Sequence, residues 1–338
     1  MAYKNFLRAF FAISGLIICV LASCAKTESS RIELALGTVC SITLFEQGQE
    51  SVYDEIFSRI REIESLMSVN IPSSDVSRIN AAAGIEPVQV DKDTFKVIAH
   101  AIYFAELSGG ALDPTVGPLV ALWGINSPAP HVPTQEEINS VLPLVNWRNV
   151  ELYNQSVYLT RRGMALDLGA IAKGYAADEA ARIIREAGIN RARIDLGGNI
   201  ILIGQKKDRS PWRVGIQNPE ESHGAITGIL QIPEQSVVTS GIYERFFEEN
   251  GKRYHHIFLP SNGYPVDNGL TSVTIITENS IDADALSTSV FVLGYERGRL
   301  LLESIPQTEA VFIFSDRSIR TTPGAMFILT DKSFSVKR

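Results

Sequence analysis

Apolar side chains recur at helical spacing in two stretches of the first third of the chain. In residues 51–67 and 93–107 they fall three or four positions apart, as on one face of an amphipathic helix. Residues 68–80 between them are polar and include a proline, which is typical of a connecting segment. We therefore predict two helices joined by a polar loop.

Alternating apolar and polar positions predict strands elsewhere. Residues 31–45 alternate in this way, and residues 150–160 predict a hairpin that turns at Asn154-Gln155. Residues 193–203 predict one strand interrupted by Gly197-Gly198, where backbone or a ligand could approach closely. Further strands are predicted at 212–216, 225–232, 236–241, 254–259, 270–277, 310–315 and 326–330.

The stretch 165–180 (ALDLGAIAKGYAADEA) places a buried-looking run and a glycine turn before a helix predicted from about Lys173 to Glu186. Gly188 then ends that helix. A cation opposes the dipole at a helix start, but a bound phosphate would reverse this penalty, because the first turn of a helix binds anions. The segment fits an anion site, and it also fits an ordinary turn with an exposed lysine.

Residues 111–124 (ALDPTVGPLVALWG) mix prolines and glycines with apolar residues and predict neither a regular helix nor a strand. Segments of this kind often wrap a site. Further helices are predicted from about Thr134 and over 282–293. Because strands and helices mix without regular alternation, we predict an α+β fold, a single compact domain with a mixed or antiparallel sheet and flanking helices.

The composition of the chain limits the classes of partner that it can bind. The chain has 338 residues and a net charge of -7, and no cluster of lysine and arginine offsets that charge. An acidic chain of this kind argues against a nucleic-acid partner.

The N-terminus resembles an export signal. Lys4 and Arg8 precede the apolar stretch 10–22, which has signal-peptide length and is short for a membrane span. The sequence Leu21-Ala22-Ser23-Cys24 resembles a bacterial lipobox, although a plain signal peptide beside an unrelated cysteine is the alternative. We predict a lipoprotein signal peptide at 1–23, a tether at 24–30 lipidated (palmitate) on Cys24, and one domain at 31–338.

Asp284 and Thr288 are candidate metal ligands. They lie four positions apart on the helix predicted over 282–293, and therefore on one face. A carboxylate and a hydroxyl suit a hard cation such as Mg²⁺, which binds few protein ligands and shares substrate phosphates. No cysteine–histidine spacing predicts zinc. In the alternative interpretation Asp282 caps the helix and Asp284 interacts with its dipole.

His255 and His256 are the candidate bases. On the strand predicted over 254–259 they would face opposite sides, so at most one points into a given site. Histidine suits general-base catalysis near neutral pH, although a lone histidine can equally be structural. The sequence contains no Walker loop, GxGxxG or GxSxG motif, so P-loop, ordinary NAD and hydrolase-elbow interpretations lose support.

Nine short segments, in order, resemble the ApbE family of flavin transferases, also called FAD:protein FMN transferases. They extend across almost the whole predicted mature chain, and nine matches in order are far more specific than one. The segments are Leu36-Gly37-Thr38, Met67-Ser68, Ser77-Arg78-Ile79-Asn80, GGALDPTVGPLVALWG, LDLGAIAKGYAAD, DLGGN, SVVTSGIYER, YHHIFLPSNGYP and DADALSTSVFVLG.

The resemblance implies an activity and a set of partners. The family cleaves FAD at its diphosphate and moves FMN onto a threonine hydroxyl of exported redox proteins, releasing AMP. We predict that the lipoprotein suggested by the N-terminus is membrane-anchored and faces the periplasm, with the inner membrane favoured over the outer.

The resemblance also implies roles for individual residues. It implies Mg²⁺ bound by Asp284, Thr288 and the carbonyl of Ala170, with Ser287 close by. It implies His256 as the base that takes the proton from the acceptor threonine, with His255 facing away. The FAD contacts that it implies are Gly110, Ala111, Leu112, Asp113, Asp167, Lys173, Thr239, Ser240, Gly241 and Phe258.

Asn70 departs from the family pattern. Members commonly carry a tyrosine here that can stack on an aromatic ring of FAD, and losing such a stack could cost about 1 kcal/mol. FAD would then be held more loosely at this position, and water could compete with the threonine. The first alternative is therefore a Mg²⁺-dependent FAD pyrophosphatase that gives FMN and AMP. The second is a non-catalytic FAD-binding lipoprotein.

Overall fold

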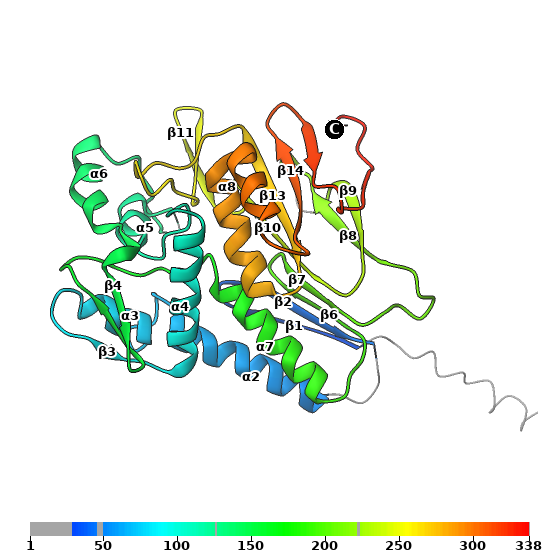
Figure 1. The fold of residues 1–338 in the computed structure, drawn as a ribbon, viewed down its shortest axis with the longest axis horizontal. Coiled ribbons are helices and arrows are strands. Elements are labelled where there is room, and N and C mark those ends of the chain that lie inside the picture. Colours follow the sequence, from blue (N-terminus) through cyan, green and yellow to red (C-terminus); the bar gives the residue numbers. More distant parts are fainter. Residues whose placement is uncertain (1–28, 46–49, 126, 222–223, 338) are drawn as a thin grey trace, which may run out of the picture.

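A nine-stranded mixed sheet forms the centre of the protein (Figure 1). The computed structural model describes residues 29–45, 50–125, 127–221 and 224–337. Neighbouring strands pair antiparallel except for the last pair, which is parallel. In spatial order the strands are β1 (Ser29–Ala35), β2 (Thr38–Leu44), β6 (Ala192–Leu196), β7 (Asn199–Ile203), β10 (Ser236–Gly241), β13 (Leu270–Thr277), β14 (Glu309–Phe314), β15 (Ser318–Thr321) and β17 (Ser335–Val336).

The two faces of this sheet are covered differently. Helices α2 (Glu50–Met67), α7 (Ala172–Glu186) and α8 (Ser280–Glu303) cover one face, and Figure 1 shows α7 and α8 in front of the strands. A small sheet packs on the other face, against β7, β10, β13, β14 and β15, in the order β16 (Phe327–Leu329), β9 (Ile226–Ile232), β8 (Trp212–Gln217). Successive residues of a strand point to opposite faces, so Val238 joins the helical core and Val237 joins the second core.

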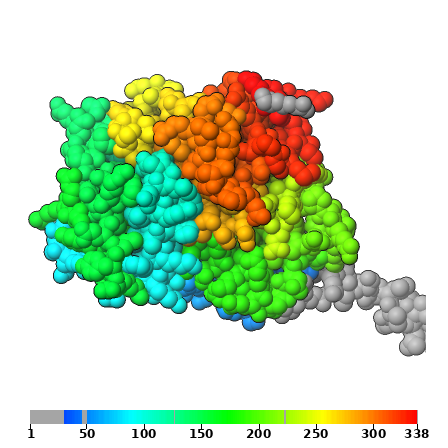
Figure 2. Space-filling model, in the orientation of Figure 1, coloured from blue at the N-terminus to red at the C-terminus, as the bar shows by residue number. Residues whose placement is uncertain are grey.

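A mainly helical region completes the molecule. Its helix α4 (Lys92–Leu107) contacts α2 and also α8, where His100 Nε2 lies 2.7 Å from Asp282 Oδ1, and Figure 2 shows a continuous surface from α4 to α8. Its elements are α3 (Asp75–Ala81), α4 (Lys92–Leu107), α5 (Gly117–Trp123), α6 (Gln135–Val141), the 3₁₀ turns Leu142–Leu144 and Trp147–Asn149, and the sheet β3 (Val88–Gln89), β5 (Ser156–Leu159), β4 (Val150–Tyr153). The predicted single α+β domain is confirmed.

Several predicted elements are confirmed at nearly their predicted bounds. Helices α2, α4, α6 and α7 and strands β8, β9, β10 and β13 occur where the pattern places them. The β4–β5 hairpin turns at Asn154 and Gln155, whose φ angles are 47° and 59°. A polar capping box at Thr134 and Glu137 begins α6.

Other predictions were wrong. Residues 68–80 are not all loop, because the Ser74 hydroxyl accepts a hydrogen bond from the backbone N–H of Ser77 and caps α3. Residues 111–124 contain α5, whose Pro118 stands in the first turn, where proline is tolerated. Residues 193–203 form two strands, because Gly197 and Gly198 have φ angles of 62° and 92° and turn the chain.

The remaining differences concern element ends. The predicted strand 254–259 is β12 (Lys252–His255), paired with β11 (Phe246–Glu249), and it stops before His256. Helix α8 extends well beyond the predicted 282–293 and is interrupted at Gly294. Strand β1 already begins at Ser29, inside the predicted tether. The signal peptide and Cys24 lie outside the described residues, and no described helix is long and apolar enough to cross a membrane.

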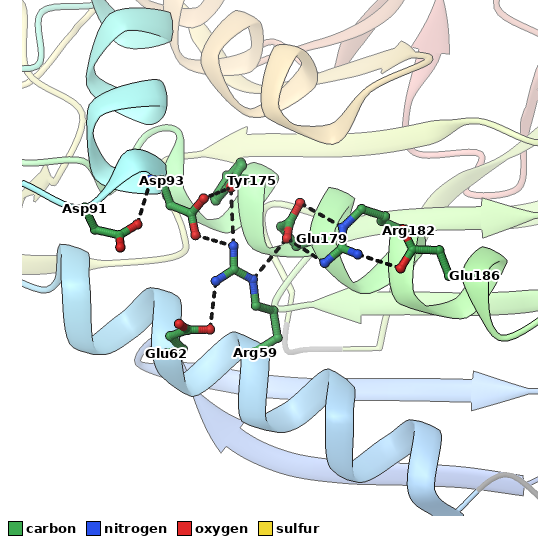
Figure 3. A network of polar contacts seen from close by, with 8 residues as sticks. All are labelled: Arg59, Glu62, Asp91, Asp93, Tyr175, Glu179, Arg182 and Glu186. Atoms are coloured by element: carbon green, nitrogen blue, oxygen red, sulfur yellow. Dashed lines mark hydrogen bonds and ion pairs between the residues drawn. The ribbon is translucent and has the colours of Figure 1, made fainter. Parts of the chain in front are cut away.

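Arg59 anchors a polar network between α2, α4 and α7 (Figure 3). Its guanidinium donates to Asp93, to Glu62 at 2.8 Å and to Glu179 at 3.0 Å. Tyr175 Oη donates to Asp93 Oδ1 at 2.9 Å. Burial alone would raise the pKa of Asp93, but the hydrogen bonds from Arg59 and Tyr175 and the charge of Arg59 outweigh it and hold the pKa below its usual range. The network lines a recess of about 670 Å³ that contains none of the predicted site residues.

We expect Asp93→Ala to reduce the free energy of unfolding at pH 7 by about 2–4 kcal/mol, because Arg59 and Tyr175 would lose a largely buried partner. The effect should shrink in acid: a carboxylate with a lowered folded-state pKa stabilises above its unfolded pKa of about 4 and loses that contribution as the pH falls through the folded value. Urea unfolding at several pH values measures both the loss of unfolding free energy at pH 7 and its decrease in acid. Glu186→Ala is the control, because its pair with Arg182 is exposed and should contribute below about 1 kcal/mol. Equal losses in the two variants would contradict the prediction.

Candidate functional site

Lys173, one of the predicted site residues, meets the β6–β7 turn at one edge of the large sheet. The β6–β7 turn lies beside β2 there, since the N–H of Gly197 donates to the carbonyl of Val39 at 3.1 Å. Asn199 at the start of β7 pairs with Val238 on β10, so the turn also lies beside the end of β10. The start of α7 reaches the same edge, because Lys173 Nζ donates to Asn199 Oδ1 at 2.8 Å.

Asp284 supplies the buried carboxylate of this edge. Its side chain projects from α8, and the residue is 3% exposed. Oδ2 accepts the backbone N–H of Gly174 at 2.9 Å, and Oδ1 lies 3.5 Å from Lys173 Nζ. A Cβ on Gly174 would fall 2.3 Å from the carbonyl oxygen of Ser280. Only glycine therefore lets α7 approach α8 closely enough for this contact.

Three hydroxyl groups cluster about one helical turn after Asp284. Ser287 Oγ donates to the carbonyl of Asp284 at 2.9 Å. Ser240 Oγ lies 2.8 Å from Ser287 Oγ and 3.3 Å from Thr288 Oγ1. The end of β10 and the first third of α8 thus bring three hydroxyl oxygens together, of which Ser287 is buried and Ser240 and Thr288 are partly exposed.

The donor set fits a hard cation. Among the residues that the structure describes, no group of three or more His, Cys, Asp or Glu side chains could hold a metal. A metal ion here would therefore depend on Asp284, hydroxyl and carbonyl oxygens and substrate oxygens, which suits Mg²⁺ and does not suit zinc. Ala170, whose carbonyl is the remaining predicted ligand, lies in the turn just before α7.

The alternative role for Asp282 as a helix cap is wrong. Helix α8 begins after Asn279, whose side chain makes no capping bond. Asp178 of α7 caps it from outside, accepting the N–H groups of Ser280 at 2.8 Å and Ile281 at 2.9 Å. Burial raises the pKa of Asp178 to about 6 despite these bonds.

Asp167 lies in the turn that precedes α7. Its carboxylate accepts the N–H of Gly169 at 2.8 Å, and its own N–H donates to the carbonyl of Pro114 at 2.8 Å. Burial raises the pKa of Asp167, although the Gly169 N–H and the charge of Arg245 act in the opposite direction. The Asn80 amide bonds both backbone groups of Leu166, at 2.7 and 3.0 Å, so it fixes the segment 68–80 beside Asp167.

Hydrogen bonds to the buried Asp113 side chain stabilise the predicted FAD loop 110–113. Asp113 accepts bonds from the N–H and hydroxyl of Thr115, at 2.8 and 2.6 Å, and from the N–H of Trp147 at 3.0 Å. Burial raises the pKa of Asp113 against these bonds. Gly110 has a φ of 88°, and Ala111 and Leu112 are buried. Any FAD contact in this loop therefore depends on its backbone groups.

The other predicted FAD contacts differ in accessibility. Ser240 is partly exposed at the end of β10, and Thr239 Oγ1 lies 2.8 Å from Thr274 Oγ1. Gly241 is buried. Phe258 is also buried and packs with Trp123, their ring centres 5.9 Å apart. Asn70 is exposed in the loop before α3, where its N–H donates to Ser68 Oγ at 3.2 Å.

The two histidines have different environments. His255 is buried: Nε2 donates to the carbonyl of Val266 at 2.9 Å and Nδ1 accepts the N–H of Ile257 at 3.3 Å. Both ring nitrogens are therefore used within the protein, as expected for a histidine that faces away. His256 is partly exposed, and its Nδ1 donates to the carbonyl of Arg245 at 3.2 Å, which leaves Nε2 as the acceptor.

Burial lowers the pKa of His256 to about 4, with smaller contributions in the same direction from the charges of Arg245 and Lys173. The imidazole is therefore neutral at pH 7 and able to accept a proton.

Three residues of this edge were not predicted. Asn199 contacts Lys173, Asn80 fixes Leu166, and Arg245 contacts His256. All three belong to family-like segments that were noted as matches only. A polar residue directly after a glycine turn, as at Asn199, was the available signal.

Comparisons with known proteins extend over the same segments. A model of the ApbE family matches residues 36–312. A protein of Treponema pallidum (strain Nichols) named FAD:protein FMN transferase is 37% identical over 336 residues, covering 92% of this chain and 93% of the relative. One of the same name from Klebsiella pneumoniae (strain 342) is 40% identical over 286 residues, covering 84% and 88%.

Two solved structures are also similar. The crystal structure of the ApbE protein from Thermotoga maritima has a TM-score of 0.78 at 33% identity and covers 90% of this chain and 97% of its own. The flavin transferase ApbE from Vibrio cholerae has a TM-score of 0.77 at 30% identity and covers 91% and 98%.

Proposed function

The chain belongs to the ApbE family and is an enzyme, and from this premise we propose that it transfers FMN from FAD to a threonine hydroxyl of an exported acceptor protein, with Mg²⁺ and with release of AMP. The observation that carries the proposal is the convergence of Asp284, Lys173 and the Ser240, Ser287 and Thr288 hydroxyls at one edge. A buried carboxylate with hydroxyl oxygens and one ammonium group suits a diphosphate bound with a metal ion.

Each site residue would have its own role in the reaction. Asp284, Thr288 and the Ala170 carbonyl would hold Mg²⁺, with Ser287 beside them, and the ion would neutralise charge on the diphosphate. Lys173 places a second positive charge next to Asp284. The threonine oxygen attacks the phosphorus on the FMN side, the bond from that phosphorus to the bridging oxygen breaks, and AMP leaves. The proton of the threonine passes to Nε2 of the neutral His256.

Hydrolysis is the second candidate, and Asn70 favours it. A family tyrosine that could stack on FAD is absent at this exposed position, so water could reach the same phosphorus. The chain would then act as an FAD pyrophosphatase giving FMN and AMP. Both reactions use the same residues and break the same bond, and they differ only in the nucleophile.

We further propose that the enzyme is an exported lipoprotein. The support is the sequence Leu21-Ala22-Ser23-Cys24 after an apolar stretch. Cys24 would carry the lipid, and the domain would face the periplasm, anchored in the inner membrane.

Chromatography of FAD tests these proposals. A soluble form that begins at Ala25 is incubated with FAD and Mg²⁺, with and without a threonine-bearing acceptor domain, and with EDTA as the control. We expect AMP together with flavin bound covalently to the acceptor. Free FMN and AMP without acceptor would indicate hydrolysis, and Asn70→Tyr should then lower free FMN several-fold, because a restored stack stabilises bound FAD by about 1 kcal/mol. Uncut FAD in every tube would contradict both reactions.

A further inference from the structure

Lys173 has two partners at the site, and only one of them is charged. Its Nζ lies 3.5 Å from Asp284 Oδ1 and donates to Asn199 Oδ1 at 2.8 Å. The Asn199 contact is the shorter one. Asn199 is 1% exposed and follows directly on the Gly197-Gly198 turn, so its position is fixed by the β6–β7 hairpin.

The orientation of the Asn199 amide is determined by Lys173. An ammonium group donates only, so the atom that faces it must be the amide oxygen. Nδ2 therefore points elsewhere, and it is buried without a hydrogen-bond partner among the described residues. An unpaired buried donor destabilises a fold. The stability of the protein therefore does not explain the presence of this amide.

The neutral partner matters once a cation occupies Asp284. Without a metal ion, the Asp284 carboxylate attracts Lys173. With a metal ion bound there, the ammonium group is repelled from Asp284, and a lysine with no other partner would compete with the ion for the carboxylate. The Asn199 side-chain oxygen is uncharged. It can therefore hold Lys173 in place, so that the ammonium group does not compete with the metal ion for the Asp284 carboxylate.

We propose that Asn199 is a positioning residue that holds the Lys173 ammonium group at the edge of the cation site, so that the lysine and the ion act together on the FAD diphosphate. The inference rests on the proposed function and deepens it. Asn199 itself does not touch the reacting atoms.

Asn199→Leu tests this role, because leucine has a similar volume and no amide. Lys173 would then move onto Asp284. We expect the affinity for Mg²⁺, measured by calorimetry without FAD, to fall about tenfold, as for the loss of an outer-shell partner. We expect FAD binding in EDTA, followed by flavin fluorescence, to weaken several-fold, and KM for FAD to rise more than kcat falls. The midpoint of thermal unfolding should not fall, because an unpaired buried amide is removed.

A double-mutant cycle separates positioning from a direct or structural effect. If Asn199 acts through Lys173, Asn199→Leu should have no further effect on Mg²⁺ or FAD affinity in a Lys173→Met background. The matched control is Asn218→Leu, since Asn218 is equally buried but bonds Glu221 and Asp331 away from the site. It should lower stability and leave both affinities unchanged.

Two results would overturn the inference: wild-type Mg²⁺ and FAD affinities in Asn199→Leu, or the same losses whether or not Lys173 is present. Neither measurement needs turnover. A wild-type protein that binds FAD and Mg²⁺ without releasing AMP would therefore contradict the proposed function and would still test the pairing of Asn199 with Lys173.

Discussion

Replacing Asp284 by alanine is expected to reduce FAD cleavage in Mg²⁺ about a thousandfold or more. Asp284 is the buried carboxylate one helical turn before Ser287 and Thr288, whose hydroxyls cluster with that of Ser240. A metal ion that polarises phosphoryl oxygens contributes several kcal/mol to the transition state, and each 1.36 kcal/mol corresponds to a tenfold change in rate. The substitution also removes the charged partner of Lys173 and leaves Asn199 as its remaining contact.

AMP release measured by chromatography gives the rate, and calorimetry gives the Mg²⁺ affinity. Asp282→Ala is the matched control, because Asp282 lies on the same helix but is partly exposed and contacts His100 at 2.7 Å. Its rate should stay within about threefold of wild type, a difference below 1 kcal/mol. Unchanged turnover in Asp284→Ala would place the metal ligands elsewhere. Equal losses in both variants would indicate damage to α8.

The local sequence pattern was sufficient to predict elements that are stabilised by contacts between residues close in sequence. The apolar spacing of residues 51–67 predicted α2, and Asn154-Gln155 predicted the turn of the β4–β5 hairpin. Helix α3 was missed because it is only seven residues long, with Val76 and Ile79 as its buried apolar residues, and its start is stabilised by a cap from Ser74. A helix this short carries a weak periodic signal.

The contacts that assemble the site could not be predicted, because they join distant segments. The N–H of Gly174 and the Asp284 carboxylate are 110 residues apart in sequence. The sequence pattern suggested Asp282 as the cap of α8. The cap is instead Asp178 of α7, which is 102 residues away in the sequence. Spacing predicted that Asp284 and Thr288 share one helix, and both lie within α8. Spacing could not place Asn199 next to Lys173.

His256→Ala is expected to lower FMN transfer by about 10²–10⁴-fold, the contribution of a positioned general base. His256 Nδ1 is bonded to the carbonyl of Arg245, so Nε2 is the nitrogen that accepts the proton. The affinity for FAD should change little, because the base acts on the acceptor hydroxyl. Transfer to an acceptor domain gives the rate, and flavin fluorescence gives the affinity. His100→Gln is the control, since His100 pairs with Asp282 and should leave the rate within about threefold.

The pH dependence provides a separate test of the same residue. Because the folded-state pKa of His256 is about 4 and the unfolded value is about 6.5, the folded protein binds fewer protons between these values. The neutral form therefore stabilises the fold above about pH 6.5, and that contribution is lost as the pH falls towards 4. We expect this loss to be about 1–2 kcal/mol, since the imidazole is partly exposed, and to be absent in His256→Gln. Transfer by the wild type should likewise remain constant from pH 8 to about pH 6, because His256 is still neutral in this range. The rate should fall only in more acidic solution, where His256 becomes protonated. A rate that already halves near pH 6.5 would mean that the base is another group.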